Sequence, residues 1–248
     1  MITIENKLVY TTLEELVDAS HVALVVVDMQ NDFCKPGWAF DHLGIDLSMY
    51  PPMIPRLARL ITGAREAGVL VIYIQMTMLP GRRSESPAQI RFNMRLHLAL
   101  HQESEPLRYT IEGTAGQEII PELAPQPGDL VVRKYRSSGF WGTNLDMLLR
   151  SNNIQTVIMT GCTTEGCVES TARDALFNDY YVVLPEDCVA SDDPRQHEAS
   201  LFLMRHRFDV VSSEDILAVW KGPLQQAHEA RGGVRLTAEQ ASIAAPRE

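Results

Sequence analysis

Three side chains suited to nucleophilic chemistry follow apolar runs of this sequence: Asp28, Lys134 and Cys167. The runs are rich in Val and Ile, which is typical of buried strands. In an open parallel α/β sheet the ligand-binding crevice lies outside the carboxyl ends of the strands. We therefore expect an acid, an amine and a thiol to converge in one crevice, which indicates a nucleophile site.

The elements that must position these side chains are short strands that alternate with amphipathic helices. Strands are predicted at residues 23–27, 69–75, 130–133, 156–161, 181–184 and 208–211, and helices at 51–67, 88–101, 167–178 and 194–207. The strands show no clean polar alternation, as expected where both faces are covered. Alternating strands and helices imply right-handed crossovers. The predicted fold is α/β, a three-layer, doubly wound, mostly parallel sheet with helices on both faces.

The length of 248 residues, without a Pro/Gly/Ser-rich linker, predicts one domain over residues 1–220. Residues 76–112 interrupt the regular alternation after a predicted strand, so we expect a lid, a binding wall or a subunit contact. This insertion carries five arginines: Arg82, Arg83, Arg91, Arg95 and Arg108. The polar tail, residues 221–248, has little to bury.

Composition excludes several classes of partner. The net charge of −10 argues against nucleic acid, whose phosphates need a basic surface. No apolar run approaches the roughly 20 residues that cross a bilayer, and residues 1–5 lack the pattern of a secretory signal, so we expect a cytoplasmic protein. Residues 29–33, after the first main strand, contain no Gly-x-Gly-x-x-Gly, so no dinucleotide is expected. We predict no cofactor.

Cys167 differs from the other cysteines, which are Cys34, Cys162 and Cys188. A buried cysteine is usually an inert small hydrophobe, and no spacing here supports a zinc site. Cys167, however, follows a predicted strand-to-helix turn over residues 161–166. At a helix amino terminus, unpaired N–H groups and the macrodipole favour a thiolate. The same N–H groups can hold a developing oxyanion.

Three ordered segments, residues 25–33, 133–140 and 160–175, resemble the isochorismatase-like cysteine hydrolases. The resemblance extends over roughly residues 20 to 220. It implies that Asp28, Lys134 and Cys167 form the family's catalytic triad. It also implies a cis peptide bond between Cys162 and Thr163, with the backbone N–H groups of Thr163 and Cys167 as an oxyanion hole.

The chemistry expected of such a site is acyl transfer. Asp28 would accept the thiol proton, Lys134 would stabilise the charges, and Cys167 would attack a carbonyl carbon. We predict a cysteine amidohydrolase that cleaves a C–N bond of a small amide or ureide through a thioester and releases ammonia or an amine. The alternatives are a vinyl ether hydrolase like isochorismatase itself or a simple amidase of the maleamate type. A redox sensor using Cys162 and Cys167, or an inactive scaffold, are the rivals from other classes.

The substrate-binding residues are predicted less directly. Phe33, Phe140 and Trp141 suit the walls around a planar amide or urea, and Gln30 lies close to Asp28 in the sequence. Ordinary core packing is the alternative for the aromatic residues. A carboxylate on the substrate would be held by an arginine of the insertion.

No metal is predicted. The resemblance implies that nicotinamidases hold a metal through an Asp-x-His pair near the end of the second strand, where residues 75–78 contain no histidine. His97 and His101 share one predicted helix face, but such a pair is more often packed or solvated than metal-bound.

The insertion also predicts an oligomer. Ile90, Met94 and Leu98 lie on one face of its predicted helix, and Phe92, Leu96 and Leu100 on a second. The surface of a single domain usually covers only one face of such a helix. We therefore expect the other to meet a second copy of the chain, in a homodimer or homotetramer.

Overall fold

Six parallel strands form the centre of the protein in the computed structural model, which describes residues 1–98 and 108–222. They are β3 (Val22–Val27), β4 (Leu70–Met76), β5 (Leu130–Lys134), β6 (Thr156–Cys162), β7 (Tyr181–Pro185) and β9 (Asp209–Val211). Their spatial order is β5-β4-β3-β6-β7-β9, and the short β8 (Val189–Ala190) pairs with β6. The predicted mostly parallel sheet is confirmed.

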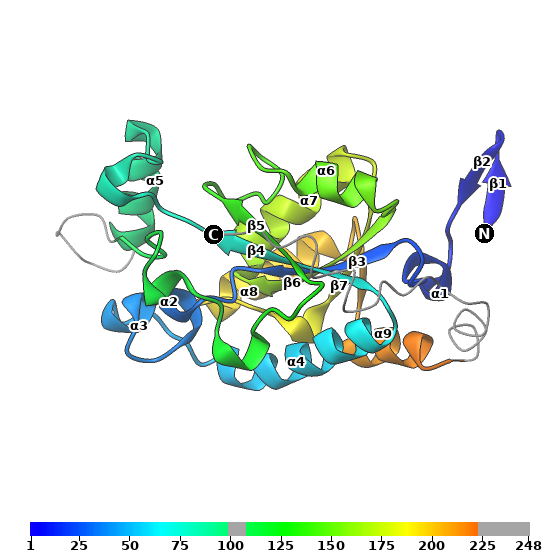
Figure 1. Cartoon of the computed structure of the whole chain (residues 1–248), viewed down its shortest axis with the longest axis horizontal. Helices are drawn as coiled ribbons and strands as arrows, with labels where there is room; N and C mark the ends of the chain where they lie inside the picture. The colour runs from blue at the N-terminus through cyan, green and yellow to red at the C-terminus, as the bar shows by residue number, and fades with distance from the viewer. Residues whose placement is uncertain (99–107, 223–248) are drawn as a thin grey trace.

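Helices cover both faces of this sheet (Figure 1). The helices α4 (Tyr50–Glu66) and α9 (Ser213–Trp220) pack on one face, and α6 (Leu145–Ser151), α7 (Glu169–Phe177) and α8 (Pro194–Met204) on the other. The central strand β3 serves both cores, since Leu24 and Val26 face one while Val25 and Val27 face the other. All six residues of β3 are buried, which explains the absence of polar alternation. The predicted three-layer arrangement is confirmed.

Segments outside the layers gather at the carboxyl ends of the strands, at the left of Figure 1. They are α2 (Asn31–Cys34), α3 (Ala39–His42) and α5 (Pro87–Leu98). The helix α5 belongs to the predicted insertion and begins one residue before the expected start. Residues 99–107 lie outside the described part of the chain. The insertion therefore stands at the sheet edge where the reactive side chains were expected.

Short turns of helix complete the chain. They are 3-10 turns at Pro80–Arg82, Ala115–Gln117, Pro121–Leu123 and Glu186–Cys188, and a π-helical turn at Thr164–Val168. The π-helical turn replaces the first turn of the helix predicted over residues 167–178, and α7 begins only at Glu169. π-helical turns often mark functional sites.

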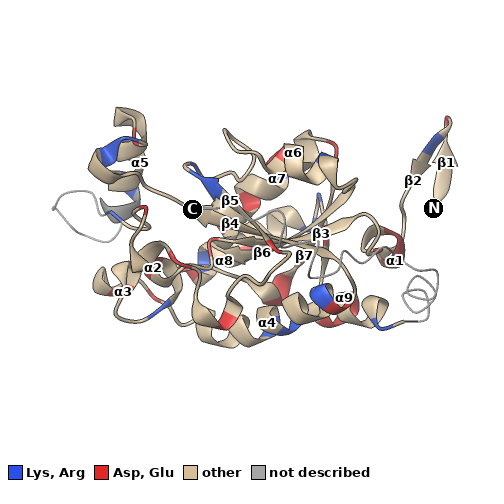
Figure 2. Cartoon of the chain, in the orientation of Figure 1, with Lys and Arg blue, Asp and Glu red and all other residues tan. Residues whose placement is uncertain are grey.

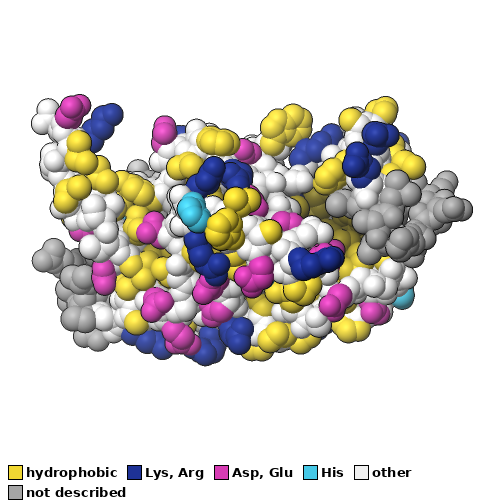
Figure 3. Space-filling view, turned by 180° about the vertical axis from the view of Figure 1, so that it is seen from behind, with side chains coloured by type: hydrophobic (Ala, Val, Ile, Leu, Met, Phe, Trp, Pro, Cys, Tyr) yellow, Lys and Arg dark blue, Asp and Glu magenta, His cyan; other side chains and the backbone are white. Residues whose placement is uncertain are grey.

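The amino terminus was not predicted to be structured. Residues Ile2–Ile4 (β1) and Lys7–Val9 (β2) form an antiparallel hairpin, followed by the short helix α1 (Leu13–Leu16). The hairpin stands off the body of the protein and exposes the apolar side chains of Ile2, Ile4 and Leu8 (Figures 1 and 3). The predicted tail lies outside the described residues from residue 223 onward.

Charged residues of both signs are interspersed over the outer elements, while the central strands carry few (Figure 2). No helix within the described part of the chain is long and apolar enough to cross a membrane.

Candidate active site

The parallel sheet brings Asp28, Lys134 and Cys167 together. Asp28 directly follows β3, Lys134 is the last residue of β5, and Cys167 lies in the π-helical turn after β6. Lys134 Nζ lies 2.8 Å from Asp28 Oδ2 and 3.0 Å from Cys167 Sγ. The ammonium group is therefore in contact with both the carboxylate and the sulfur.

Asp28 is held rigidly at the end of β3. Its backbone has φ of +52°, in the left-handed region that costs a non-glycine residue of the order of 1 kcal/mol. Its amide donates to Ile74 O at 2.9 Å, and its Oδ1 accepts a hydrogen bond of 2.9 Å from the Met76 amide. Oδ2 contacts Lys134 as an ion pair but accepts no well-aligned hydrogen bond from a described residue. That oxygen is available to accept a proton.

Gly161 permits the close approach of β6 to β3 beside Asp28. It pairs with Val27 and has φ of +102°. A Cβ atom at this position would lie 2.0 Å from the Val27 carbonyl oxygen, so a larger residue would force the two strands apart. The next residues, Cys162 and Thr163, are joined by a cis peptide bond, at the position to which the family resemblance assigns one.

Lys134 has almost no access to water. Its side chain is fully buried, and Nζ also donates to the Arg136 carbonyl oxygen at 3.1 Å. Burial alone would lower the pKa of Lys134, but the charges of Asp28 and Cys167 raise it above its usual value. Lys134 is therefore a permanent cation at the centre of the site.

Burial has the opposite effect on the two partners of Lys134. It raises the pKa of Asp28, while Lys134 and the Met76 amide act against that rise. Burial raises the pKa of Cys167 to about 12, again against the effect of Lys134. Burial therefore favours the neutral forms of the Asp28 carboxyl and the Cys167 thiol, and the Lys134 ammonium favours their charged forms. The effect of burial on Cys167 opposes the preference for a thiolate that is expected at a helix amino terminus.

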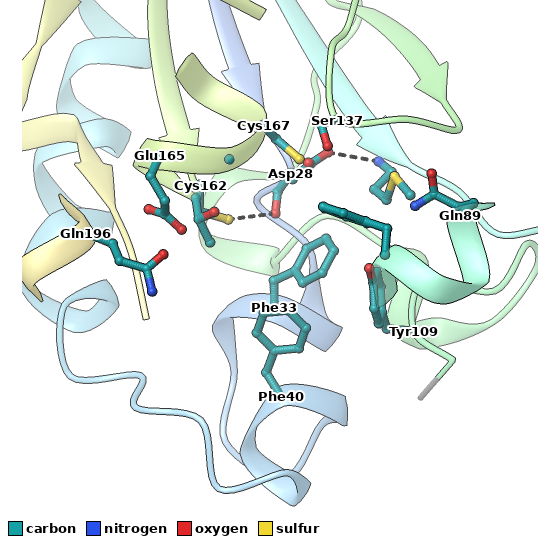
Figure 4. Close-up of a pocket in the computed structure, with 14 residues that line it drawn as sticks. Asp28, Phe33, Phe40, Gln89, Tyr109, Ser137, Cys162, Glu165, Cys167 and Gln196 are labelled. Carbon is teal, nitrogen blue, oxygen red and sulfur yellow. Dashed lines mark hydrogen bonds between the residues drawn. The ribbon is translucent and has the colours of Figure 1, made fainter. Parts of the chain in front are cut away.

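A cavity of about 250 Å³ opens onto these side chains (Figure 4). Asp28, Cys162, Thr163 and Cys167 are among the residues that line it. Phe33, Phe40 and Tyr109 form an aromatic wall, with ring centroids 4.8 to 5.6 Å apart. The remaining lining residues are Met76, Gln89, Phe92, Ser137, Glu165, Gly166 and Gln196.

The residues predicted to bind substrate lie in different parts of the structure. Phe33 lines the cavity, but Gln30 and Phe140 do not. Gln30 is fully buried, and its amide group bonds to the backbone of Met76 and Gln117, so it positions the strand end behind Asp28. Phe140 is partly buried and packs against the core, with its ring beside that of Tyr180. Trp141 is 65% exposed, contacts the Arg136 guanidinium through its ring and lines an adjoining, more open depression.

The other lining residues differ in whether the sequence could have indicated them. Tyr109 comes from the far end of the insertion, where the Thr110 amide donates to Asp32 Oδ2 at 2.6 Å and ties this segment to α2. No local pattern marks such a long-range contact. Glu165 is different, because it lies two residues before Cys167 within the recognised motif and therefore had a positional signal.

Comparison with known proteins agrees with this fold. A family model described as the isochorismatase domain matches residues 22–215. The structure of an isochorismatase-like hydrolase from Alkaliphilus metalliredigens is 29% identical, has a TM-score of 0.64, and covers 81% of this chain and 99% of its own. N-carbamoylsarcosine amidase from Thermoplasma acidophilum is 31% identical, with a TM-score of 0.60 over 78% of this chain and 96% of its own.

A third similar structure is the pyrazinamidase of Pyrococcus horikoshii in complex with zinc. It is 27% identical, with a TM-score of 0.63 over 77% of this chain and 99% of its own. The chain therefore belongs to the isochorismatase family of hydrolases, and the resemblance read from its three motifs is confirmed.

Across the described part of the chain, no three His, Cys, Asp or Glu residues are grouped so that they could hold a metal ion. His101 and the side chain of His97 lie outside that part. Metal independence therefore stays a prediction.

Proposed function

We propose that this protein is a cysteine amidohydrolase that cleaves a C–N bond of a small amide or ureide through a thioester intermediate. The observation that carries the proposal is the placement of Lys134 Nζ, 2.8 Å from Asp28 Oδ2 and 3.0 Å from Cys167 Sγ, beside a cavity. A base, a fixed positive charge and a nucleophile in mutual contact are the parts that acyl transfer needs.

In the first half of the reaction Cys167 Sγ attacks the substrate carbonyl carbon while its proton passes to Asp28 Oδ2. The negative charge moves to the carbonyl oxygen, which the N–H groups of Thr163 and Cys167 would receive. Asp28 then gives its proton to the leaving nitrogen, the C–N bond breaks, and ammonia or an amine departs. A thioester to Cys167 remains.

Water completes the cycle. Asp28, again ionised, takes a proton from a water molecule that attacks the thioester carbonyl carbon. The C–S bond breaks, and the proton returns from Asp28 to the sulfur as the acid product leaves. The raised pKa of Asp28 suits a carboxyl group that works in both directions. Lys134 stays charged throughout and stabilises both the carboxylate and the transient thiolate.

The cavity supports a small planar substrate. Its volume of about 250 Å³ lies just below the usual range for drug-sized ligands. The aromatic wall of Phe33, Phe40 and Tyr109 offers flat surfaces against which an amide or urea group can pack.

The proposal is tested by ammonia release from a panel of small amides and ureides, including biuret, N-carbamoyl amino acids, ureidoacrylate, maleamate and simple primary amides. We expect at least one compound to release ammonia in a reaction that iodoacetamide labelling of Cys167 stops. Turnover that continues unchanged after complete labelling of Cys167 would contradict the thiol mechanism.

Metal independence is the second expected result. Because Cys167 supplies the nucleophile and Lys134 the positive charge, activity should survive prolonged EDTA treatment and dialysis. Elemental analysis should find well under one zinc per chain. A stoichiometric metal whose removal stops turnover and whose return restores it would instead point to a metal site that includes His97 or His101.

The proposal includes a homodimer or homotetramer. On α5, Phe92 is 45% and Met94 42% exposed, so each of the two apolar faces of this helix leaves a large side chain uncovered. Light scattering at micromolar concentration should give at least about twice the chain mass of 27.8 kDa. Met94→Glu should lower that mass, while Met147→Glu, at an exposed methionine on α6, should not. A monomeric wild type with full activity would rule the oligomer out.

A further inference from the structure

One carboxylate in the cavity has no partner in the catalytic scheme. Glu165 lies in the π-helical turn, two residues before Cys167, and lines the same cavity. Its Oε2 atom is buried and accepts no hydrogen bond from any described residue. No described Lys, Arg or His forms an ion pair with Glu165, although ten such pairs occur elsewhere in the described chain. A buried carboxylate oxygen without a partner is costly, so this position calls for a donor from a ligand.

A second carboxyl group, that of Asp192, lies near Glu165. Burial raises the pKa of the part-buried Asp192, and the charge of Glu165 is the next largest cause of that rise. The two acids therefore lie close together. Figure 4 shows Glu165 and Gln196 on the same side of Asp28, with Gln89 and Tyr109 on the other. The cavity therefore has an acidic end and an aromatic end, with the reactive sulfur between them.

The arginines that were expected to hold a substrate carboxylate do not reach this cavity. None of the arginines of residues 76–112 is among its lining residues. Arg82 pairs with Glu85 at 3.1 Å, and Arg108 donates to the Leu79 carbonyl oxygen at 3.1 Å. No described Lys or Arg is among the residues that line the cavity, and Asp28 already neutralises Lys134 beside it. An anionic substrate group would therefore meet Glu165 without a compensating positive charge.

From these observations we infer that Glu165 determines specificity, and that the substrate is an amide or ureide whose far end carries a positively charged nitrogen. The inference rests on the proposed function for the reaction at Cys167. A cationic ammonium or guanidinium group would supply the donor that Oε2 lacks and would neutralise the charge near Asp192. The overall charge of −10 would favour the approach of such a substrate at low salt.

The charge preference of the cavity can be measured without knowing the substrate. Cys167 is modified with 2-aminoethyl methanethiosulfonate, which is cationic, and with 2-sulfonatoethyl methanethiosulfonate, which is anionic. Both rates are divided by those for free glutathione, and peptide mapping assigns the label to Cys167. We expect the corrected rate with the cationic reagent to be larger by about tenfold or more, as for a partly buried charge pair.

Two variants separate the effect of Glu165 on this rate ratio from the effect of the overall charge of the protein. Glu165→Gln keeps the size of the side chain and should reduce the rate ratio to near one. Glu198→Gln removes the same charge from an exposed position on α8, outside the cavity, and should leave the ratio almost unchanged. Equal rates in the wild type, faster reaction with the anionic reagent, or a ratio that Glu165→Gln does not change would overturn the inference.

A matched set of substrates gives the second readout. β-Alaninamide, butyramide and succinamate share one primary amide and chain length but carry a positive, neutral or negative end. We expect kcat/KM for ammonia release to be highest for β-alaninamide, and Glu165→Gln to remove that advantage. Cys167-dependent turnover that favours butyramide or succinamate would refute the inference and leave the proposed function standing. A cationic preference in the labelling that depends on Glu165, with no amide or ureide hydrolysed, would support the role of Glu165 in charge selection and contradict the proposed function.

Discussion

Replacing Cys167 with serine should lower kcat by about 10³-fold or more, equivalent to about 4 kcal/mol in the barrier. The serine hydroxyl is a much weaker nucleophile at neutral pH, and Asp28 is placed to take a proton from sulfur. Lys134 Nζ lies 3.0 Å from Cys167 Sγ, where it can stabilise a thiolate. Steady-state ammonia release with the best substrate of the panel measures the effect.

The control for Cys167→Ser is Cys188→Ala, which removes a buried thiol that does not line the cavity. This control should lower stability by a few kcal/mol at most and leave kcat close to that of the wild type. Circular dichroism should be unchanged for Cys167→Ser. A Cys167→Ser protein with normal circular dichroism and near-normal kcat would refute the assignment of the nucleophile.

Asp28→Asn should reduce kcat to a similar degree. The isosteric amide can neither accept the thiol proton nor deliver one to the leaving nitrogen. It also leaves the buried ammonium of Lys134 without its counter-ion, which should destabilise the fold by about 3 kcal/mol. Activity should therefore be measured well below the melting temperature of the variant.

The control for Asp28→Asn is Asp129→Asn, which breaks the 2.6 Å ion pair with Arg65 away from the cavity. It should lower stability with little change in kcat. The pH profile gives a more specific readout, because Asp28 has to be ionised to accept the proton. Burial raises its pKa above the usual value of an aspartate, so wild-type kcat/KM should fall as the pH drops through that raised value. An unchanged acid limb in the residual activity of Asp28→Asn would show that another group is the base.

The sequence predicted the parts of the structure that depend on local pattern. The apolar run before Asp28 reads as a strand because its side chains are buried on both faces, and the structure places it at the centre of the sheet. The convergence of Asp28, Lys134 and Cys167 follows from the geometry of parallel strands alone. Their roles, in contrast, came from the resemblance to a family, since composition and periodicity do not distinguish a catalytic Asp from a structural one.

The rest of the cavity depends on contacts between distant parts of the chain. Tyr109 reaches Phe33 only because the insertion returns to α2, which no periodicity indicates. Gln30 and Trp141, in contrast, were predicted from the sequence to bind substrate, but neither lines the cavity. Both lie in or near the recognised motifs, but the Gln30 amide is used by the backbone and Trp141 points to the surface. Proximity in sequence to a reactive residue did not establish that a side chain lines the cavity.

The most direct test of the account is the mass of the protein during turnover. A reaction quenched with acid within the first turnovers should contain a fraction of chains heavier by the acyl half of the substrate. Peptide mapping should place that mass on the segment containing Cys167, and neutral hydroxylamine should remove it, as expected of a thioester. An acyl group on any other residue, or steady turnover with no acylated chain in wild type and in variants slowed at Asp28, would contradict the central claim.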